Sequence, residues 1–118
     1  ALAYIVLGGW IESLSILKES ILFISTSRYE GLSYATLEAL ALSKPCILTN
    51  VDGNREVVKE GVNGFLTEEN VEDISKKTIE VLSNIELIKF MASKSREKYQ
   101  ESYSINNNIK SLEKLYLQ

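Results

Sequence analysis

The sequence predicts an α/β domain built around a parallel sheet, and three observations support this. Short apolar runs at residues 4–7, 21–24 and 46–49 have the length and composition of buried strands. Segments with helical spacing of apolar residues separate these runs, and each run ends in a polar or glycine-containing loop. Strands that alternate with helices in this way indicate βαβ units, whose strands run in parallel. Because the chain has 118 residues and no linker-like segment, we expect residues 1–118 to form a single domain.

The first half of the chain is predicted to hold three strands and two helices. In order, these are a strand at 4–7, a short helix near 12–19, a strand at 21–24, a helix at 33–43 and a strand at 46–49. Ser33 is a suitable N-cap for the second helix. Lys44 precedes Pro45, and a residue in that position disfavours helical backbone, so we expect the helix to end there.

The segment after Asn50 is predicted to pass through a loop into a short helix at about 55–59. Gly61 is the expected left-handed residue just beyond the end of that helix. Asn63 and Gly64 are predicted to turn before a short strand at 65–67. Since an Asn-Gly pair commonly marks a hairpin, the residues alone do not decide how this strand pairs.

The last third of the chain is predicted to be helical. Asn70 and Asp73 resemble a capping box at the start of a helix over about 71–83. Three groups of apolar and small residues keep helical spacing: Val71, Ile74, Thr78, Val81 and Leu82; Ile88, Met91, Ala92, Ser95 and Tyr99; and Ile105, Ile109, Leu112 and Tyr116. We expect these faces to pack in the core.

Composition excludes several classes of function. The net charge is −3 and no Lys/Arg cluster is present, which argues against a nucleic-acid partner. No run of about 18 apolar residues and no leader pattern occurs, so we expect a soluble, cytoplasmic segment. Histidine is absent and no metal-ligand spacing is seen, so neither a zinc site nor a Ser-His-Asp triad is predicted. The lone Cys46, in an apolar strand, is predicted to be a buried reduced thiol.

A ligand site is predicted at residues 25–33, which leave the carboxyl end of the strand at 21–24. Ligands of open α/β sheets bind outside such ends. The following helix would present free N–H groups there, and Gly31 would let a diphosphate approach the backbone. The carboxylates of Glu30 and Glu38 could accept paired hydrogen bonds from a hexose and a ribose. The alternative is that Glu30 caps the helix and Glu38 is solvated or pairs with a lysine.

Residues 27–66 also carry a family pattern. The features that recur in order are the Glu-x7-Glu pair at Glu30 and Glu38, the Glu-Ala-Leu-Ala segment running to Lys44 and Pro45, a strand ending at Asn50, a Gly-x-x-Glu loop at Gly53 and Glu56, and Gly61 with Asn63-Gly64 before Phe65. Together they resemble the C-terminal domain of a retaining glycosyltransferase of the GT-B fold, in glycosyltransferase family 4. The resemblance covers nearly the whole chain, from about Leu7. It implies a partial Rossmann-like, three-layer parallel sheet with C-terminal helices, and therefore parallel pairing of the strand at 65–67.

The resemblance implies that the parent protein is a retaining hexosyltransferase of cell-surface polysaccharide synthesis. It would move a sugar from a UDP-, GDP- or ADP-sugar to a glycan or lipid-linked acceptor without a divalent metal. The N-terminal acceptor domain and the first strand–helix units of the donor domain, with their phosphate-facing Arg and Lys, have no counterpart here. We therefore expect this fragment alone to be inactive. The parent would lie at the inner face of the membrane, and the exposed last helix would favour self-association of the fragment.

Site residues follow from the resemblance position by position. Glu30 matches the group that contacts hydroxyls of the transferred sugar, as a positioning group rather than a nucleophile. Glu38 matches the carboxylate that holds the ribose. The remaining matches are Gly31, Leu32, Ser33 and Tyr34, whose backbone N–H groups would meet the sugar and diphosphate, and Trp10 and Ile11, which would border the nucleobase. Arg28 is expected on the surface, and structural roles are expected for Gly53 and Glu56.

Two other classes of function are compatible with these residues. A nucleotide-sugar epimerase of GT-B-like fold shares the fold and the donor, and would release epimerised sugar nucleotide without an acceptor. A non-catalytic nucleotide-binding or interaction module would share the fold alone. The presence of both Glu30 and Glu38 argues against the module.

Overall fold

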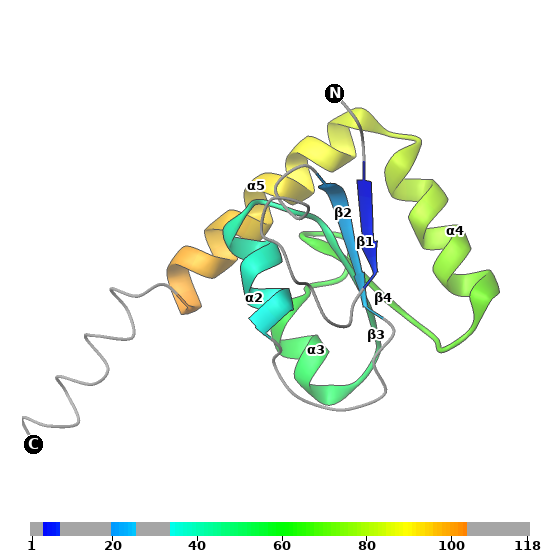
Figure 1. The fold of residues 1–118 in the computed structure, drawn as a ribbon, viewed down its shortest axis with the longest axis horizontal. Coiled ribbons are helices and arrows are strands. Elements are labelled where there is room, and N and C mark those ends of the chain that lie inside the picture. Colours follow the sequence, from blue (N-terminus) through cyan, green and yellow to red (C-terminus); the bar gives the residue numbers. More distant parts are fainter. Residues whose placement is uncertain (1–3, 8–19, 26–33, 104–118) are drawn as a thin grey trace, which may run out of the picture.

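The computed structural model describes residues 4–7, 20–25 and 34–103, with side chains from residue 20 onward except at 34 and 35. Its centre is a four-stranded parallel sheet with the strands in sequence order (Figure 1). The strands are β1 (Tyr4–Leu7), β2 (Ser20–Ser25), β3 (Cys46–Thr49) and β4 (Gly64–Thr67). All three neighbouring pairs are parallel. The α/β prediction is therefore confirmed, and the Asn63-Gly64 pair leads into a parallel strand, of which Gly64 is the first residue, rather than making a hairpin.

Four helices are described around this sheet. They are α2 (Tyr34–Ala41), α3 (Asp52–Val57), α4 (Val71–Leu82) and α5 (Ile85–Ser102). The start of α4 confirms the predicted cap, because Asn70 Oδ1 accepts a hydrogen bond from the Asp73 N–H at 2.7 Å. The Asp73 carboxylate reaches the Glu68 N–H at 2.8 Å rather than that of Asn70, so the capping box is incomplete. The expected helix near 12–19, the Ser33 cap and the face at 105–116 lie outside the described residues.

Helix α2 ends two residues earlier than predicted, at Ala41. The Ser43 N–H donates to Leu40 O at 3.1 Å and the Lys44 N–H to Ala39 O at 2.9 Å, which is the Schellman pattern. Ser43 occupies the left-handed position with φ 60°, where glycine is usual. The end of α2 is thus set before Pro45 restricts the chain.

The prediction for α3 was wrong at both ends. The helix begins at Asp52 rather than near residue 55, so Gly53 and Glu56 are helical and not part of a loop. Val58 is its C-cap, in extended conformation, and Gly61 is not its C′ residue. Gly61 instead has φ +76° in the turn before β4, where its N–H donates to Gly64 O at 2.8 Å.

Gly64 lies inside β4 rather than in a turn, and close backbone packing explains the glycine. A Cβ built at this position would be 1.7 Å from the carbonyl oxygen of Cys46 on β3. No side chain fits in that space, so the first residue of β4 has to be glycine.

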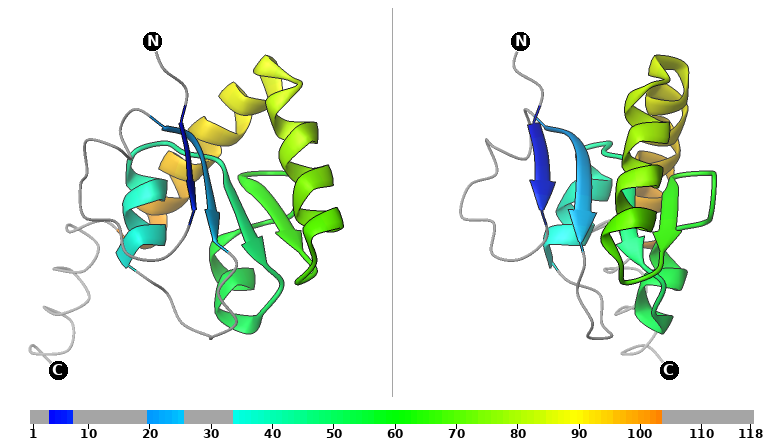
Figure 2. Two further views of the ribbon diagram at one scale, coloured as in Figure 1. Left: turned by 45° about the vertical axis from the view of Figure 1, so that its right-hand side comes forward. Right: turned by 90° about the vertical axis from the view of Figure 1, so that its right-hand side faces the viewer.

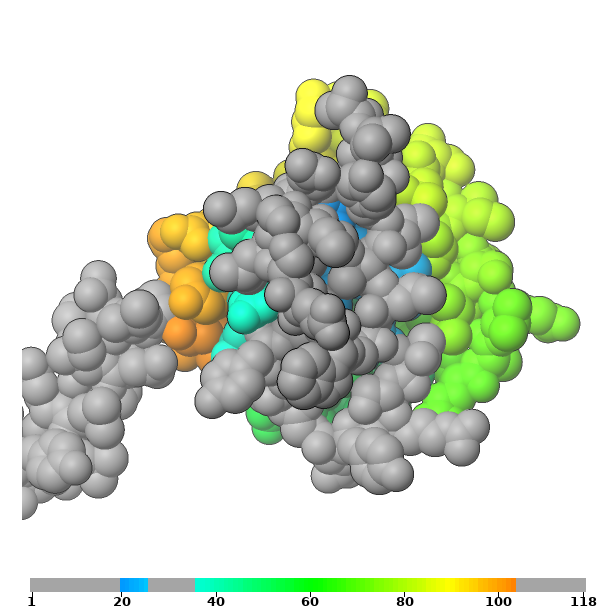
Figure 3. Space-filling model, viewed as in Figure 1, coloured from blue at the N-terminus to red at the C-terminus, as the bar shows by residue number. Residues whose placement is uncertain are grey.

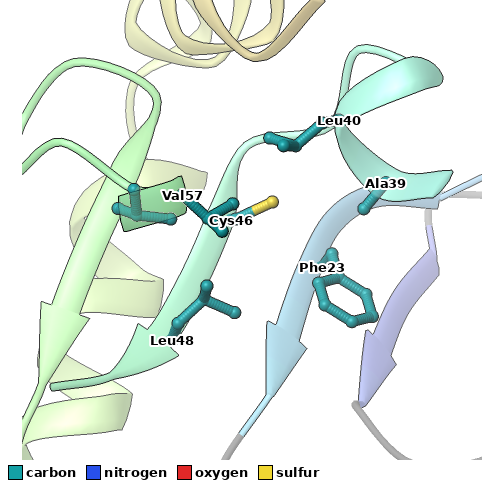
Figure 4. Packing of buried hydrophobic residues seen from close by; sticks show 7 residues of the cluster. Phe23, Ala39, Leu40, Cys46, Leu48 and Val57 are labelled. Carbon is teal, nitrogen blue, oxygen red and sulfur yellow. The ribbon is translucent and has the colours of Figure 1, made fainter. Parts of the chain in front are cut away.

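Helices cover both faces of the sheet. On one face, side chains from β2, α2, β3 and α3 point toward one another, as Phe23, Ala39, Leu40, Cys46, Leu48 and Val57 show in Figure 4. On the other face, the buried side chains are Leu22, Ile24, Ile47, Phe65, Val81 and Met91, from β2–β4, α4 and α5. The sheet is therefore the middle of three layers, with α2 and α4 on opposite sides (Figure 2).

The apolar faces predicted for α4 and α5 agree with the observed burial to different degrees. All five residues predicted for α5, from Ile88 to Tyr99, are buried or partly buried. On α4, Ile74, Thr78 and Val81 face inward as predicted, but Val71 and Leu82 are 77% and 39% exposed. The two errors are the terminal members of the group, at the first and last residues of α4.

Helix α5 crosses the amino ends of the strands. Its first half packs on one core through Leu87 and Met91, and Tyr99 near its end packs on the other. Between them, Ser95 Oγ donates to Asn63 O, just before β4, at 3.3 Å. The neighbouring Arg96 donates to Ala41 O, at the end of α2, at 2.6 Å. This route places α5 across the edge opposite to the carboxyl ends of the strands.

Candidate functional site

The carboxyl edge of the sheet is the part of the fold where a ligand site is expected. Strand β2 ends at Ser25, and its register places Ser25 opposite Leu48, so β3 continues one residue further to Thr49. The segment with Glu30 to Ser33 follows β2, and Trp10 and Ile11 follow β1. These six predicted site residues, like Arg28, lie outside the described residues.

Helix α2 holds the two predicted site residues that are described. Only four residues separate its last residue, Ala41, from the start of β3, so its C-terminus lies at the amino edge. Its N-terminus at Tyr34 therefore points back toward the carboxyl edge, about 12 Å away for eight residues. Glu38 is the fifth residue of the helix and is partly buried. Ala39 and Leu40, both 0% exposed, anchor this part of α2 in the core.

A second polar group lies at the same edge, where β3 passes into α3. Asn54 is 7% exposed, and its Nδ2 donates to Thr49 O at 2.9 Å and approaches Thr49 Oγ1 at 3.5 Å. Arg55 Nε donates to Asn50 Oδ1 at 2.7 Å, and Arg55 also pairs with Asp52. The Asn50 N–H in turn donates to Thr67 O, at the end of β4, at 2.8 Å.

Sequence reasoning placed Gly53 and Glu56 in a structural loop and overlooked the residues between them, Asn54 and Arg55. The available signal was an asparagine four residues after Asn50, just before the short helix predicted at about 55–59. Such a residue, if buried, needs a hydrogen-bond partner. Val51 at the N-cap makes no side-chain cap, so nothing local marked the start of α3.

A hollow of about 480 Å³ lies elsewhere, between the end of α3 and the second half of α5. Its lining mixes both charges: Arg55, Glu56, Val57, Lys59, Val62, Asn63, Lys94, Glu97, Lys98 and Glu101. Burial and, second, the Glu56 carboxylate raise the pKa of the nearby Tyr103. Most of these residues lie toward the amino edge, so the hollow is distinct from the predicted donor crevice.

In the space-filling view the end of α5 and helix α4 form opposite flanks of the molecule (Figure 3).

Cys46 is a buried thiol, as predicted. It is 0% exposed, and burial raises its pKa to about 12, so it stays protonated at neutral pH. Its Sγ donates to Lys44 O at 3.4 Å. A protonated thiol in the core is a poor nucleophile, and Cys46 therefore serves packing.

The described part of the chain contains neither a cluster of metal ligands nor a helix that could span a membrane. No group of three or more His, Cys, Asp or Glu residues is close enough there to hold a metal ion. None of the helices among the described residues is both long and apolar enough to cross a membrane.

The fold and the polar residues at the carboxyl edge of the sheet together define a class of protein. It is an α/β domain with helices on both faces of a parallel sheet, an architecture that nucleotide-binding domains share. Within that class the family is identified by sequence. The family model for glycosyl transferases group 1 matches residues 6–102. The chain belongs to this family, which confirms the resemblance to glycosyltransferases noted in the sequence.

A curated relative supports the same family. The chain is 31% identical over 114 residues to the UDP-Gal:alpha-D-GlcNAc-diphosphoundecaprenol alpha-1,3-galactosyltransferase of Escherichia coli. That match covers 96% of this chain and 30% of the relative. The chain thus spans less than a third of the length of this enzyme.

Two solved structures share the fold of this chain. A mutant of S. aureus TarM, in complex with Fondaparinux, alpha-GlcNAc-glycerol and UDP, superposes with a TM-score of 0.78 at 27% identity. The match covers 89% of this chain and 22% of the TarM chain. Anabaena HepE in complex with UDP superposes with a TM-score of 0.75 at 22% identity. The match covers 86% of this chain and 29% of HepE, and it shows that the two share a fold.

Proposed function

We propose that this chain is the donor-binding part of a retaining glycosyltransferase that moves a sugar from a nucleotide-diphosphate donor to a glycan or lipid-linked acceptor. The observation that carries the proposal is the family match over residues 6–102. The E. coli relative is by name a galactosyltransferase with a UDP-sugar donor and a diphosphoundecaprenol acceptor. Because the chain spans 30% of that relative, the acceptor half of the reaction is assigned to the rest of the parent protein.

The donor is proposed to bind at the carboxyl edge. Helix α5 occupies the amino edge, and α2 directs its N-terminus toward the carboxyl edge. There the backbone N–H groups of Gly31, Leu32, Ser33 and Tyr34 would bind the diphosphate and the sugar. Glu38 would hold the ribose hydroxyls, Glu30 the hydroxyls of the sugar, and Trp10 and Ile11 would border the base.

The proposed chemistry uses the protein mainly for positioning and for stabilising the leaving group. As the glycosidic bond to the diphosphate breaks, negative charge grows on the phosphate oxygens, and preorganised amides at the helix terminus stabilise it. Glu30 would orient the sugar without attacking it, and the configuration at the anomeric carbon would be retained. We propose that transfer needs no divalent metal. The parent is proposed to work in the cytoplasm, at the inner face of the membrane.

The test is a titration of the full-length parent protein with UDP, GDP and ADP by calorimetry. UDP comes first, because TarM was solved with UDP. We expect one nucleotide to bind and Glu38→Ala to weaken it about ten-fold or more, since hydrogen bonds to a charged group contribute about 1.5–3 kcal/mol. Glu80→Ala is the matched control, because Glu80 is an exposed helical glutamate in the last turn of α4.

Each outcome of that titration is informative. Binding of one nucleotide, weakened by Glu38→Ala and unaffected by Glu80→Ala, would support the proposal and name the base. Failure of the full-length protein to bind any of the three would contradict it and favour a non-catalytic module. Retention is then checked by NMR of the product, where an inverted anomeric configuration would contradict the mechanism.

A further inference from the structure

We propose that Asn54 is a positioning residue for the donor site, which it serves by holding the chain where β3 leaves the sheet. This inference rests on the proposed function, because it assumes that the carboxyl edge binds the nucleotide. Asn54 touches neither reacting atoms nor donor in this assignment. It acts through Thr49, Asn50 and Val51, the residues that form the wall of the edge beside β2.

The first support is the pair of bonds that Asn54 makes from within α3. Its Nδ2 reaches back five residues to Thr49 O at 2.9 Å, and its own backbone N–H donates to Val51 O at 3.0 Å. Thr49 O also accepts from the Val51 N–H at 2.9 Å. Thr49 is 0% and Asn54 7% exposed, so water cannot readily replace these bonds. The turn is therefore held from inside the protein.

A second brace holds the same turn from the solvent side. Arg55 Nε donates to Asn50 Oδ1 at 2.7 Å, and its Nη2 lies 3.5 Å from Asn50 O. The ion pair with Asp52 holds the guanidinium at the first residue of α3. With the Asn50 N–H bonded to Thr67 O, residue 50 is fixed to β4 as well.

The location of this turn explains the role proposed for the hydrogen bonds of Asn54 and Arg55. Because Ser25 pairs with Leu48, Thr49 and Asn50 are the next residues along the edge from the end of β2. Neighbouring strands lie about 4.8 Å apart, so the turn borders the carboxyl end of β2, where the proposed donor site begins. Displacement of a wall by about 1 Å is enough to disturb a bound substrate.

The chain offers a matched control in a second buried asparagine, Asn63. It is 3% exposed, its Nδ2 donates to Val57 O at 2.9 Å, and its Oδ1 accepts from the Lys59 N–H at 2.8 Å. Asn63 thus clamps a turn with the same chemistry as Asn54. It does so at the amino edge, beneath α5, away from the proposed donor crevice.

The experiment compares Asn54→Ala and Asn63→Ala in the full-length protein, with Arg55→Ala as a surface variant that removes only the outer brace. Two quantities are measured for each: the Tm by thermal shift, and the Kd for whichever of UDP, GDP and ADP the unmodified protein binds. We expect both asparagine variants to lower the Tm. Of these two variants, only Asn54→Ala should weaken nucleotide binding, by about five-fold or more, whereas Arg55→Ala, which leaves the inner bonds in place, should weaken it about two-fold.

Failure of this inference differs from failure of the proposed function. If the unmodified protein binds a nucleotide and Asn54→Ala binds it equally well, or if Asn63→Ala weakens binding as much, the positioning role is refuted. If Asn54→Ala does not fold, Asn54→Ser and Arg55→Ala decide, and wild-type affinity in both would refute the role. If the unmodified protein binds none of the three nucleotides, the proposed function fails and this inference fails with it.

Discussion

Replacing Gly64 by alanine tests the closest backbone contact in the sheet. The added Cβ would lie 1.7 Å from Cys46 O, 2.7 Å from Cys46 C and 3.0 Å from Cys46 N. Because Cβ atoms essentially never come within 3.0 Å of such atoms, β3 and β4 would have to separate by about 1.3 Å. Overpacking of this kind costs about 1–3 kcal/mol, and each hydrogen bond lost at the start of the ladder adds about 1 kcal/mol. We expect a loss of roughly 3–5 kcal/mol, a large part of a typical domain's stability.

The assay is urea unfolding of the 118-residue chain, followed by the fluorescence of its single tryptophan and by circular dichroism. The midpoint urea concentration should fall strongly. Gly61→Ala is the control. Gly61 has φ +76° and nothing within 4 Å of an added Cβ, so only conformational strain of about 1–2 kcal/mol is expected. If Gly64→Ala costs no more than Gly61→Ala, the close approach of β4 to Cys46 is refuted.

Two further predictions concern the same part of the fold. Ser43→Gly should raise the stability of the chain by about 0.5–1 kcal/mol in urea unfolding, because Ser43 holds φ 60° at the Schellman position of α2; no gain would mean that the serine is unstrained there. Burial raises the pKa of Cys46 to about 12 in the folded chain, against 9.0 for the ordinary thiol. The stability that the protonated thiol adds to the folded state is therefore complete below pH 9 and is lost as the pH rises toward 12. Cys46→Val should therefore lose less stability than the unmodified chain between pH 9 and 11, measured by urea unfolding, and equal losses would contradict the assignment.

Local patterns in the sequence were enough to predict most elements of the sheet. Four-residue apolar runs such as Cys46–Thr49, buried on both faces, are typical of parallel strands and need no knowledge of their neighbours. The start of α4 was equally local, because Asn70 caps the N–H of Asp73 only three residues away. The α/β class and the family pattern around Glu30 and Glu38 followed from such short-range signals.

The errors occurred where contacts between distant residues decide the conformation. Helix α3 begins at Asp52 without a side-chain cap, because burial of Asn54 and Val57 against β3 stabilises the turn. Gly64 resembles a turn residue in sequence, yet its position is dictated by the carbonyl of Cys46, eighteen residues earlier. Neither cause can be read from the residues next to it.

What the sequence by itself determined is the α/β class, the family, and the two carboxylates proposed to bind the donor. What only the tertiary structure decided is how the amino edge of the sheet is covered. Helix α5 closes the amino edge through bonds from Ser95 to Asn63 and from Arg96 to Ala41, across 32 and 55 residues of chain. Asn54 and Asn63 are alike in sequence as polar residues beside short strands. Folding buries them at opposite edges, because burial depends on the packing of whole elements rather than on neighbours along the chain.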